Sequence, residues 1–357
     1  MKVAGEYRKR RKRDWQLSEL RYSHVFLFHM KILITGGGGF LGSKLCDQLL
    51  ERGSLIGPSG VVEPIDEIVL LDAFFHHSAK DARVRQMTGD IGHRDTVFEA
   101  VGTRPDTAIF HLASMVSGEC EERFDDALRV NLDGGRYVFD AARAITGRPR
   151  VVFASSIACF GGEGMDSVNT DRTKHTPQTT YGMTKAICEM LVNDHTRKGH
   201  FDGRSVRLPT VIIRPGKPNA AASSWASGMF REPLNGQPCH LPIHWDQRHP
   251  MTGYRMVIES FIALHEVAES NLGSDRAFVL PAHTVTPRLA QAVIQEVAEQ
   301  RGLTLGPIVE AFDARIQGIV DNWPQAVDGA RASALGLPQP PALKEIVEQY
   351  VADYVGG

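Results

Sequence analysis

Short apolar runs alternate from Met30 onward with longer stretches in which apolar residues recur every three or four positions. Short runs rich in β-branched residues predict strands, and the longer period predicts amphipathic helices. We expect strands at 31–35, 67–72, 83–88, 107–112, 151–155, 205–213 and 277–280. We expect helices near 40–52, 94–102, 123–145, 179–198, 254–270, 287–301 and 342–354. Their alternation predicts an α/β protein with a doubly wound parallel sheet.

The alternation breaks down over residues 214–253, which hold six prolines and show little periodicity. Such a segment is typical of a lid or insertion. Because it follows the sixth predicted strand, right-handed crossovers place it outside the carboxyl ends of the strands, where open sheets bind ligands. We therefore predict a Rossmann domain at 30–216 plus about 254–285. A smaller C-terminal substrate-binding domain is expected at 217–253 plus about 286–357.

Charge is concentrated at the N-terminus, where residues 1–29 carry eight Lys and Arg against three Asp and Glu, although the whole chain has a net charge of −2. No apolar run there is long enough for a signal peptide, and none elsewhere is long enough for a transmembrane helix. We expect 1–29 to be a disordered extension. The body of the chain has no positive excess to attract nucleic acid or a membrane.

The five cysteines are an odd number, are widely spaced and include no CxxC pair. This usage is typical of a reducing compartment, so we expect a cytoplasmic protein. The histidines come with no HExxH motif and no Cys/His cluster. We therefore expect no metal site.

A glycine-rich turn joins the first predicted strand to the first predicted helix. Such a turn lets backbone amides approach a pyrophosphate, whose charge the helix N-terminus stabilises. Glycine-rich turns also serve as plain linkers, but a strand before and a helix after favour dinucleotide binding. We expect the cofactor to lie along Gly36, Gly39, Phe40, Leu41 and Gly42.

Carboxylates follow the next two predicted strands. Asp72 is expected to accept hydrogen bonds from ribose hydroxyls and to repel a 2′-phosphate, so it predicts NAD rather than NADP. Asp90, followed by Ile91, stands where an acceptor can meet the adenine. Either aspartate could instead only cap a turn.

Candidate chemistry centres on Tyr181 and Lys185, which are four residues apart and therefore share one face of a predicted helix. Oxidation of an alcohol needs a base for the hydroxyl proton. A nearby cation lowers the pKa of a phenol by roughly 1 to 3, so we expect Tyr181 to be that base. Ser156, at the end of the preceding predicted strand, is expected to orient the reacting oxygen.

Together these motifs resemble those of the extended short-chain dehydrogenase/reductases, the NAD-dependent epimerase/dehydratase family. The resemblance covers about 30–357 and includes His111–Ser114, Asn131 and Arg214–Gly216. It implies that Lys185 also holds ribose hydroxyls and that Ala113 and Ser114 lie along the nicotinamide ribose. It also implies a homodimer formed through the helices that carry Asn131 and Tyr181. The cofactor residues implied beyond the glycine turn and the two aspartates are Leu112, Ala113, Ser114, Asn131, Tyr181, Lys185 and Pro215.

The family supports several chemistries, and Ile157 and Ala158 stand where its dehydratases carry Asp-Glu, which argues against dehydration. The segment 214–224 is similar to that of the subgroup that oxidises the C2 hydroxyl of four-carbon aldonates such as D-erythronate to the 2-oxo acid. Alternatives are a nucleotide-sugar epimerase, an L-threonine dehydrogenase-like enzyme and a non-catalytic NAD-binding protein. Lys217 and Arg248 are further candidate cations for a substrate carboxylate. The small sugar acid is expected to contact Ser117, Ser156, Tyr181, Asn219 and Arg231.

Overall fold

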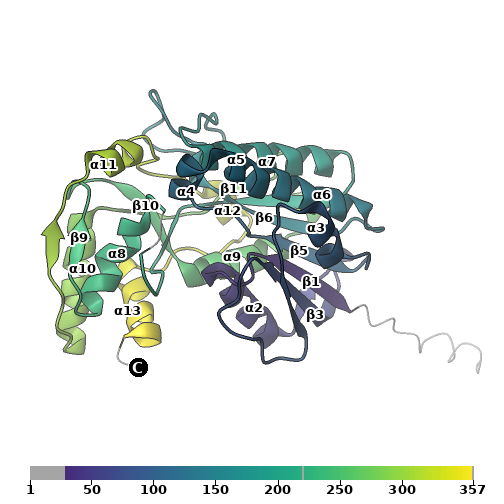
Figure 1. Ribbon diagram of the computed structural model, residues 1–357, viewed down its shortest axis with the longest axis horizontal. Coiled ribbons are helices and arrows are strands. Elements are labelled where there is room, and N and C mark those ends of the chain that lie inside the picture. Colours follow the sequence, from purple (N-terminus) through teal and green to yellow (C-terminus); the bar gives the residue numbers. More distant parts are fainter. Residues whose placement is uncertain (1–28, 219–220, 356–357) are drawn as a thin grey trace, which may run out of the picture.

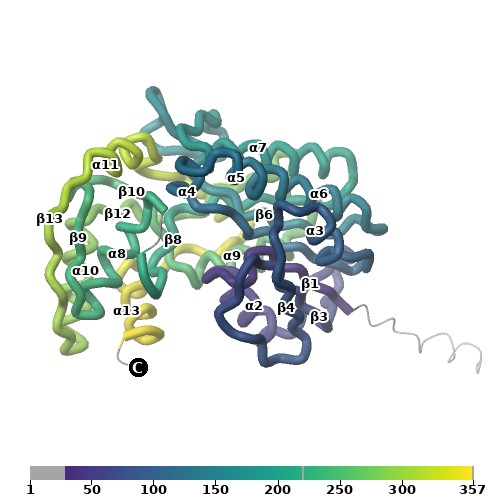
Figure 2. Tube along the Cα trace, viewed as in Figure 1, coloured from purple at the N-terminus to yellow at the C-terminus, as the bar shows by residue number. Residues whose placement is uncertain are grey.

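The computed structural model describes residues 29–218 and 221–355 (Figures 1 and 2). The expected extension up to residue 28 and the candidate Asn219 lie outside these ranges. The main sheet is built from β1 Met30–Thr35, β2 Ser54–Ile56, β3 Val62–Asp72, β4 Val84–Thr88, β5 Thr107–His111, β6 Arg150–Ser156, β7 Asp202–Leu208 and β11 Ala277–Val279.

The strands run in the order β11-β7-β6-β5-β1-β3-β2, and β4 also pairs with β3. Every pairing in this sheet is parallel except that of β2 with β3. From β1 the chain moves outward to β3 and β4, and it then returns to the other side of β1 at β5. The order therefore reverses between β1 and β5, which confirms the predicted doubly wound sheet and marks the place where such sheets bind ligands.

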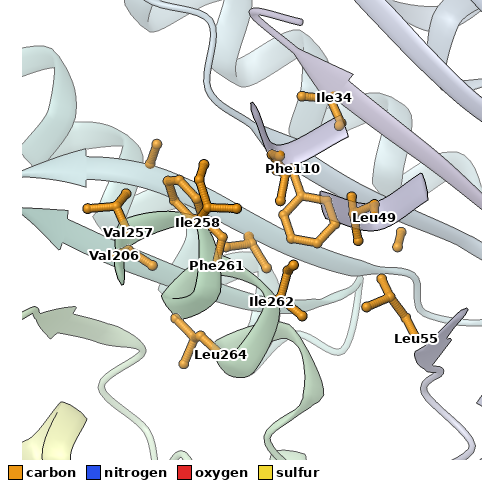
Figure 3. Packing of buried hydrophobic residues seen from close by; sticks show 14 of the residues in the cluster. Ile34, Leu49, Leu55, Phe110, Val206, Val257, Ile258, Phe261, Ile262 and Leu264 are labelled. Carbon is orange, nitrogen blue, oxygen red and sulfur yellow. The ribbon is translucent and has the colours of Figure 1, made fainter. Parts of the chain in front are cut away.

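Helices cover both faces of the main sheet (Figure 1). One face carries α2 Phe40–Arg52 and α9 Tyr254–Glu266, and the other carries α3 Arg94–Val101, α6 Gly134–Ala144 and α7 Thr180–Arg197. The central strand explains why both faces are covered, because all six of its residues are buried. Ile32 and Ile34 pack in the cluster on the α2 and α9 side, shown in Figure 3, whereas Leu33 packs on the α3 and α6 side. This alternation is the two-residue period of a strand buried on both faces.

A second hydrophobic core lies apart from the main sheet, at the left of Figure 1. Two small sheets contribute to it, in the orders β12-β10-β8 and β13-β9. The predicted division of the chain into two domains stays a prediction. The elements of this part are β8 Thr210–Ile212, α8 Ser224–Leu234, β9 Cys239–Leu241, β10 His249–Gly253, β12 His283–Val285, α10 Pro287–Arg301, β13 Ile308–Glu310, α11 Ala314–Val320 and α13 Leu343–Tyr354.

Three sequence expectations differ from the structure. The strand expected at 205–213 is broken at Pro209, because proline cannot donate to a ladder, and its two halves join different sheets. The helix expected at 123–145 runs without a break from Phe124 to Ala144, but its middle part, Leu128–Asp133, is π-helical rather than α-helical. Residues 214–253, expected to be irregular, contain α8, β9 and β10. The remaining short helices are α4 Ser117–Glu122, α5 Phe124–Ala127, a π-helical turn Leu128–Asp133, 3₁₀ turns Ile157–Cys159 and Glu269–Asn271, and α12 Ala330–Ala334.

Within residues 29–218 and 221–355, no helix combines the length and the apolar composition needed to cross a membrane.

Candidate active site

The glycine turn after β1 is a close-packed backbone cradle. Gly36 has φ +73°, and a Cβ there would lie 2.8 Å from the amide nitrogen of Ala113. A Cβ at Gly42 would overlap the carbonyl oxygen of Gly36. Gly39 precedes α2 and supplies no side-chain cap, so the positive end of the helix dipole is left for an anion. These residues fit a dinucleotide pyrophosphate, as the sequence predicts.

A groove of about 420 Å³ runs beside this cradle, at the point where the strand order reverses. Phe40 and Pro215 line an adjoining hollow that shares Gly39 with the groove. Leu41 lines the cavity that contains Tyr181. The residues predicted to bind cofactor and found in the groove wall are Gly36, Gly39, Asp72, Asp90, Ile91, Leu112, Ala113 and Ser114.

The two aspartates of the groove also fasten their own loops. Asp72 accepts hydrogen bonds from the amides of Gly38 at 2.9 Å and Phe74 at 3.3 Å. Asp90 accepts from the Gly92 amide at 2.7 Å and from Arg129 at 2.6 Å. Burial favours the protonated form of Asp90, but these two donors outweigh it and lower the pKa of the carboxyl. Both aspartates therefore cap turns and also line the groove. Turn capping and cofactor binding, the two roles that the sequence left open, do not exclude each other.

The loop after β5 is held from behind by Thr35. Its hydroxyl accepts hydrogen bonds from the amides of Leu112 and Ala113, each at 3.2 Å, and lies 2.7 Å from Nδ1 of His111. Burial lowers the pKa of His111 to about 3, with a smaller contribution from the Lys185 charge. His111 is therefore a neutral packed residue at neutral pH.

Asn131, predicted among the cofactor residues, has a different set of contacts. Its side chain is buried and bonds both polar backbone atoms of Met115, accepting from N–H at 2.7 Å and donating to C=O at 3.2 Å. The Met115 end of the groove wall is thereby fixed. Asn131 therefore positions this wall, and its predicted contact with the cofactor stays a prediction.

Ser156, Tyr181 and Lys185 meet at the carboxyl end of β6. Ser156 ends that strand and accepts a hydrogen bond from the Ala158 amide at 3.1 Å, and it lines the same cavity wall as Tyr181. The Nζ of Lys185 donates to the Ala154 carbonyl at 2.8 Å and lies 5.4 Å from the centre of the Tyr181 ring. The structure thus brings together the three residues predicted to be catalytic.

Burial dominates the ionisation of this trio. It raises the pKa of Tyr181 to about 12, and the Ser156 side chain opposes this only in part. It also lowers the pKa of Lys185 to about 8. The sequence predicts a lowered tyrosine pKa, whereas the groups of the protein by themselves raise it, because loss of solvent around the phenolate outweighs the stabilisation available from them.

Glu189 anchors the same helix one turn beyond Lys185 and was missed in the sequence. Its carboxylate accepts a short hydrogen bond from Ser155 Oγ and bonds from Arg207, whose Nη2 lies 2.8 Å away. The spacing of four residues from Lys185 was the available signal. Cys159, His175 and Glu189 could together offer ligands to a metal, but Arg207 also reaches His175 Nε2 at 2.7 Å. We therefore interpret the cluster as an ion-pair network that fixes α7 to β6 and β7.

A cavity of about 250 Å³ opens beside Tyr181 and Ser156. Among the described residues that line it, Arg214 is the one cation and there is no carboxylate. Its guanidinium donates to the Lys217 carbonyl at 2.6 Å. Seven side chains that line the cavity carry hydroxyls, and they include the predicted Ser117: Ser117, Ser156, Tyr181, Thr210, Ser223, Ser224 and Ser227.

Arg231 does not contact this cavity, which corrects its predicted role. Its buried guanidinium donates to the carbonyl of Arg214 at 2.9 Å and to Glu232 at 2.6 Å, and it lines a separate hollow. Lys217 lies on the glycine-turn side, and Arg248 is exposed. Arg214 is the cation that sequence reasoning missed. The signal for it was its place in the Arg214–Gly216 motif.

Comparison with known proteins agrees with this geometry. Residues 32–253 match the model of the NAD dependent epimerase/dehydratase family. The chain belongs to that family. Its cofactor is therefore NAD, and the protein is an oxidoreductase of the epimerase/dehydratase family.

Three relatives place the chain within the epimerase/dehydratase family. It is 40% identical to a D-erythronate dehydrogenase of Cupriavidus necator, over 91% of this chain and 98% of that protein. The structure of a nucleoside-diphosphate-sugar epimerase from Agrobacterium tumefaciens is similar, with a TM-score of 0.81 and 35% identity over 93% of this chain and 96% of that one. A GalE-like L-threonine dehydrogenase from C. necator has a TM-score of 0.76 and 26% identity, over 90% of this chain and 99% of that one.

Proposed function

We propose that the protein oxidises the C2 hydroxyl of a small sugar acid, a D-erythronate-like aldonate, to the 2-oxo acid with NAD. The composition of the cavity beside Tyr181 carries this proposal. One arginine suits one carboxylate, and the many hydroxyls suit a polyhydroxylated chain. The 40% identity to a D-erythronate dehydrogenase gives independent support.

The volume of the cavity favours a small substrate. About 250 Å³ is below the roughly 300–1,000 Å³ of pockets that hold drug-sized ligands. A four-carbon acid needs much less room than a nucleotide sugar. The size of the cavity and its single cation therefore support the same substrate class.

In the proposed reaction Tyr181 accepts the proton of the C2 hydroxyl as the C=O bond forms. Bound NAD would supply the acceptor for the hydride that leaves C2. Ser156 donates a hydrogen bond to the reacting oxygen, and the Lys185 ammonium favours the ionised form of Tyr181 electrostatically. Arg214 holds the carboxylate and so presents C2 to these groups.

Two other substrates remain candidates. The A. tumefaciens protein is described as a nucleoside-diphosphate-sugar epimerase, so interconversion of nucleotide sugars is the second candidate. L-Threonine carries an ammonium group that favours a carboxylate partner, and none of the described residues that line the cavity supplies one. This absence favours a sugar acid over an amino acid.

A substrate panel tests the proposal. Purified protein is mixed with NAD and with four- to six-carbon aldonates, L-threonine or UDP-sugars, and NADH absorbance is followed; the series is repeated with NADP. We expect NAD reduction with D-erythronate or a close relative and a weaker reaction with NADP. Interconversion of UDP-glucose and UDP-galactose without net reduction would instead make the protein an epimerase.

We also propose a cytoplasmic homodimer. Large apolar side chains are exposed on neighbouring helices of one face, where Phe124 of α5 is 52% exposed and Met190 of α7 is 56% exposed. The five cysteines are all buried and unpaired, as in a reducing compartment. Sedimentation at micromolar concentration is expected to give the dimer mass, and a monomer there would contradict the assembly. Cell fractionation tests the location.

A further inference from the structure

A threonine and a histidine form a pair in the wall of the proposed substrate cavity. Thr210 Oγ1 lies 2.6 Å from His249 Nε2, and both residues line the cavity. Their strands β8 and β10 run side by side in parallel, with Thr210 opposite Met251. The pair is therefore held by backbone pairing as well as by its own hydrogen bond.

The surroundings of His249 decide which of its two nitrogens carries a proton. His249 is 1% exposed, and its ring contacts those of Trp225 and Trp323, with ring centres 5.6 Å and 5.5 Å away. Burial lowers its pKa to about 4, so at neutral pH the ring is neutral and carries one N–H. Its Nδ1 is buried and has no hydrogen-bond partner within residues 29–218 and 221–355.

The two neutral forms of His249 differ in cost. A proton on Nδ1 would leave a buried donor without an acceptor, which is the rarer and more expensive defect. A proton on Nε2 is donated to Thr210 Oγ1 and leaves only a lone pair unused at Nδ1. Because Thr210 then accepts from His249, its own O–H is free to donate. This hydroxyl has no other partner among the described residues and lines the cavity.

We infer that His249 positions Thr210 as a hydrogen-bond donor to the substrate carboxylate, as the second anchor beside Arg214. A carboxylate accepts bonds and cannot donate, so two converging donors select it over an amide or a hydroxyl. The inference rests on the proposed function, since it takes the substrate to be an acid. Thr210 is on this view a specificity-determining residue, and His249 is a positioning residue.

Four variants test the pair by steady-state kinetics with NAD and the best acid of the panel. Thr210→Val removes the donor while keeping the shape, and we expect KM to rise about 10- to 100-fold with kcat within a few-fold. Thr210→Ser keeps the hydroxyl and is expected to restore most of the affinity. His249→Gln keeps an N–H donor, so it should raise KM less than His249→Phe does. An unchanged KM in Thr210→Val would overturn the inference.

Thr252→Val is the matched control. Thr252 pairs with Val211, one position along the β8–β10 ladder from the pair of Thr210 with Met251. It is fully buried, bonds Met256 Sδ at 2.9 Å and does not line the cavity. We expect its KM to stay within a few-fold of that of the unaltered enzyme. The primary amide of the same acid extends the test. If the Thr210 hydroxyl donates to the carboxylate, the preference for the acid over the amide falls in Thr210→Val. Equal losses of affinity for both compounds would contradict the inference.

Two measurements do not depend on turnover. Nitrogen-15 histidine spectra, with His249→Gln to assign the signal, are expected to show the proton of His249 on Nε2, and a proton on Nδ1 would overturn the inference whatever the substrate is. Equilibrium binding of D-erythronate, followed by tryptophan fluorescence, should weaken about 10- to 100-fold in Thr210→Val. A protein that binds the acid through Thr210 but does not oxidise it would refute the proposed function and retain the inference.

Discussion

One threonine–histidine pair lies behind the wall of the cofactor groove and another lines the substrate cavity, but the two threonines are used differently. Thr35 lies 2.7 Å from His111 and also accepts two backbone amides, so its hydroxyl is fully occupied in holding the groove wall. Thr210 lies 2.6 Å from His249 and makes no other hydrogen bond among the described residues. The same chemical pair fixes backbone in one region and leaves a donor facing a ligand in the other.

This difference extends to the whole of each region. Glycines and a strand-end carboxylate shape the groove, so its form follows from the backbone. Side chains from distant segments shape the cavity, so its form follows from how those segments pack. The groove is therefore expected to be sensitive to added volume, and the cavity to lost functional groups.

The largest effect is expected at Tyr181, which lines the cavity. Tyr181→Phe removes the proposed base while keeping the ring, so kcat should fall about 10²- to 10⁴-fold. The Kd for NAD, measured by calorimetry, should stay within a few-fold. Tyr137→Phe, on helix α6 away from the cavity, is the control. Full activity of Tyr181→Phe would remove Tyr181 from its proposed role.

Arg214→Gln tests the proposed carboxylate anchor of the cavity. Loss of a charged hydrogen bond to the carboxylate is expected to raise KM for the acid about 10- to 100-fold and to leave the Kd for NAD nearly unchanged. Arg248→Gln, at an exposed position that sequence analysis considered for the same task, should change neither. If Arg248→Gln weakened substrate binding instead, the assignment of the cation would be wrong.

Gly42→Ala tests the groove alone. The new methyl would overlap the carbonyl of Gly36, and overpacking of this kind costs about 1–3 kcal/mol. We expect the Kd for NAD to rise roughly 5- to 100-fold, with KM for the acid at saturating NAD little changed. Gly318→Ala, in helix α11 with open space around the new methyl, is the control. An equal Kd for NAD in the two variants would contradict the close packing of the glycine turn.

The two histidines give the smallest effect, a pH dependence of stability. Their folded pKa values, about 3 for His111 and about 4 for His249, are below the ordinary histidine value, so below about pH 6.5 the unfolded chain binds more protons. The free energy of unfolding should therefore fall with decreasing pH, on the order of 1 kcal/mol per pH unit for each ring. Urea unfolding from about pH 7 to about pH 5 measures this slope. His249→Gln should reduce the slope, and an unchanged slope would show that His249 does not contribute.

Local signals explain what the sequence predicts well. The bounds of α10 match the expected 287–301 because Thr286 caps its N-terminus and the left-handed Gly302 ends it. The glycine cradle and Asp72 are also local and were predicted. Arg214, Glu189 and His249 were missed as site residues because their roles depend on packing between segments far apart in the chain. Arg231 was misassigned because its guanidinium is buried against the Arg214 carbonyl and Glu232, contacts that only the folded structure shows.

At the strand break at Pro209 the chain passes from the main sheet to the second core. Val206 belongs to the core of the main sheet, Ile212 belongs to the second core, and Leu208, Pro209 and Thr210 between them line the cavity. A molecule in the cavity therefore rests on the short segment that passes from one core to the other. Binding of substrate in the cavity would slow amide hydrogen exchange in both cores together. The substrate would stabilise the relative position of two cores that the free chain connects here only by a bend.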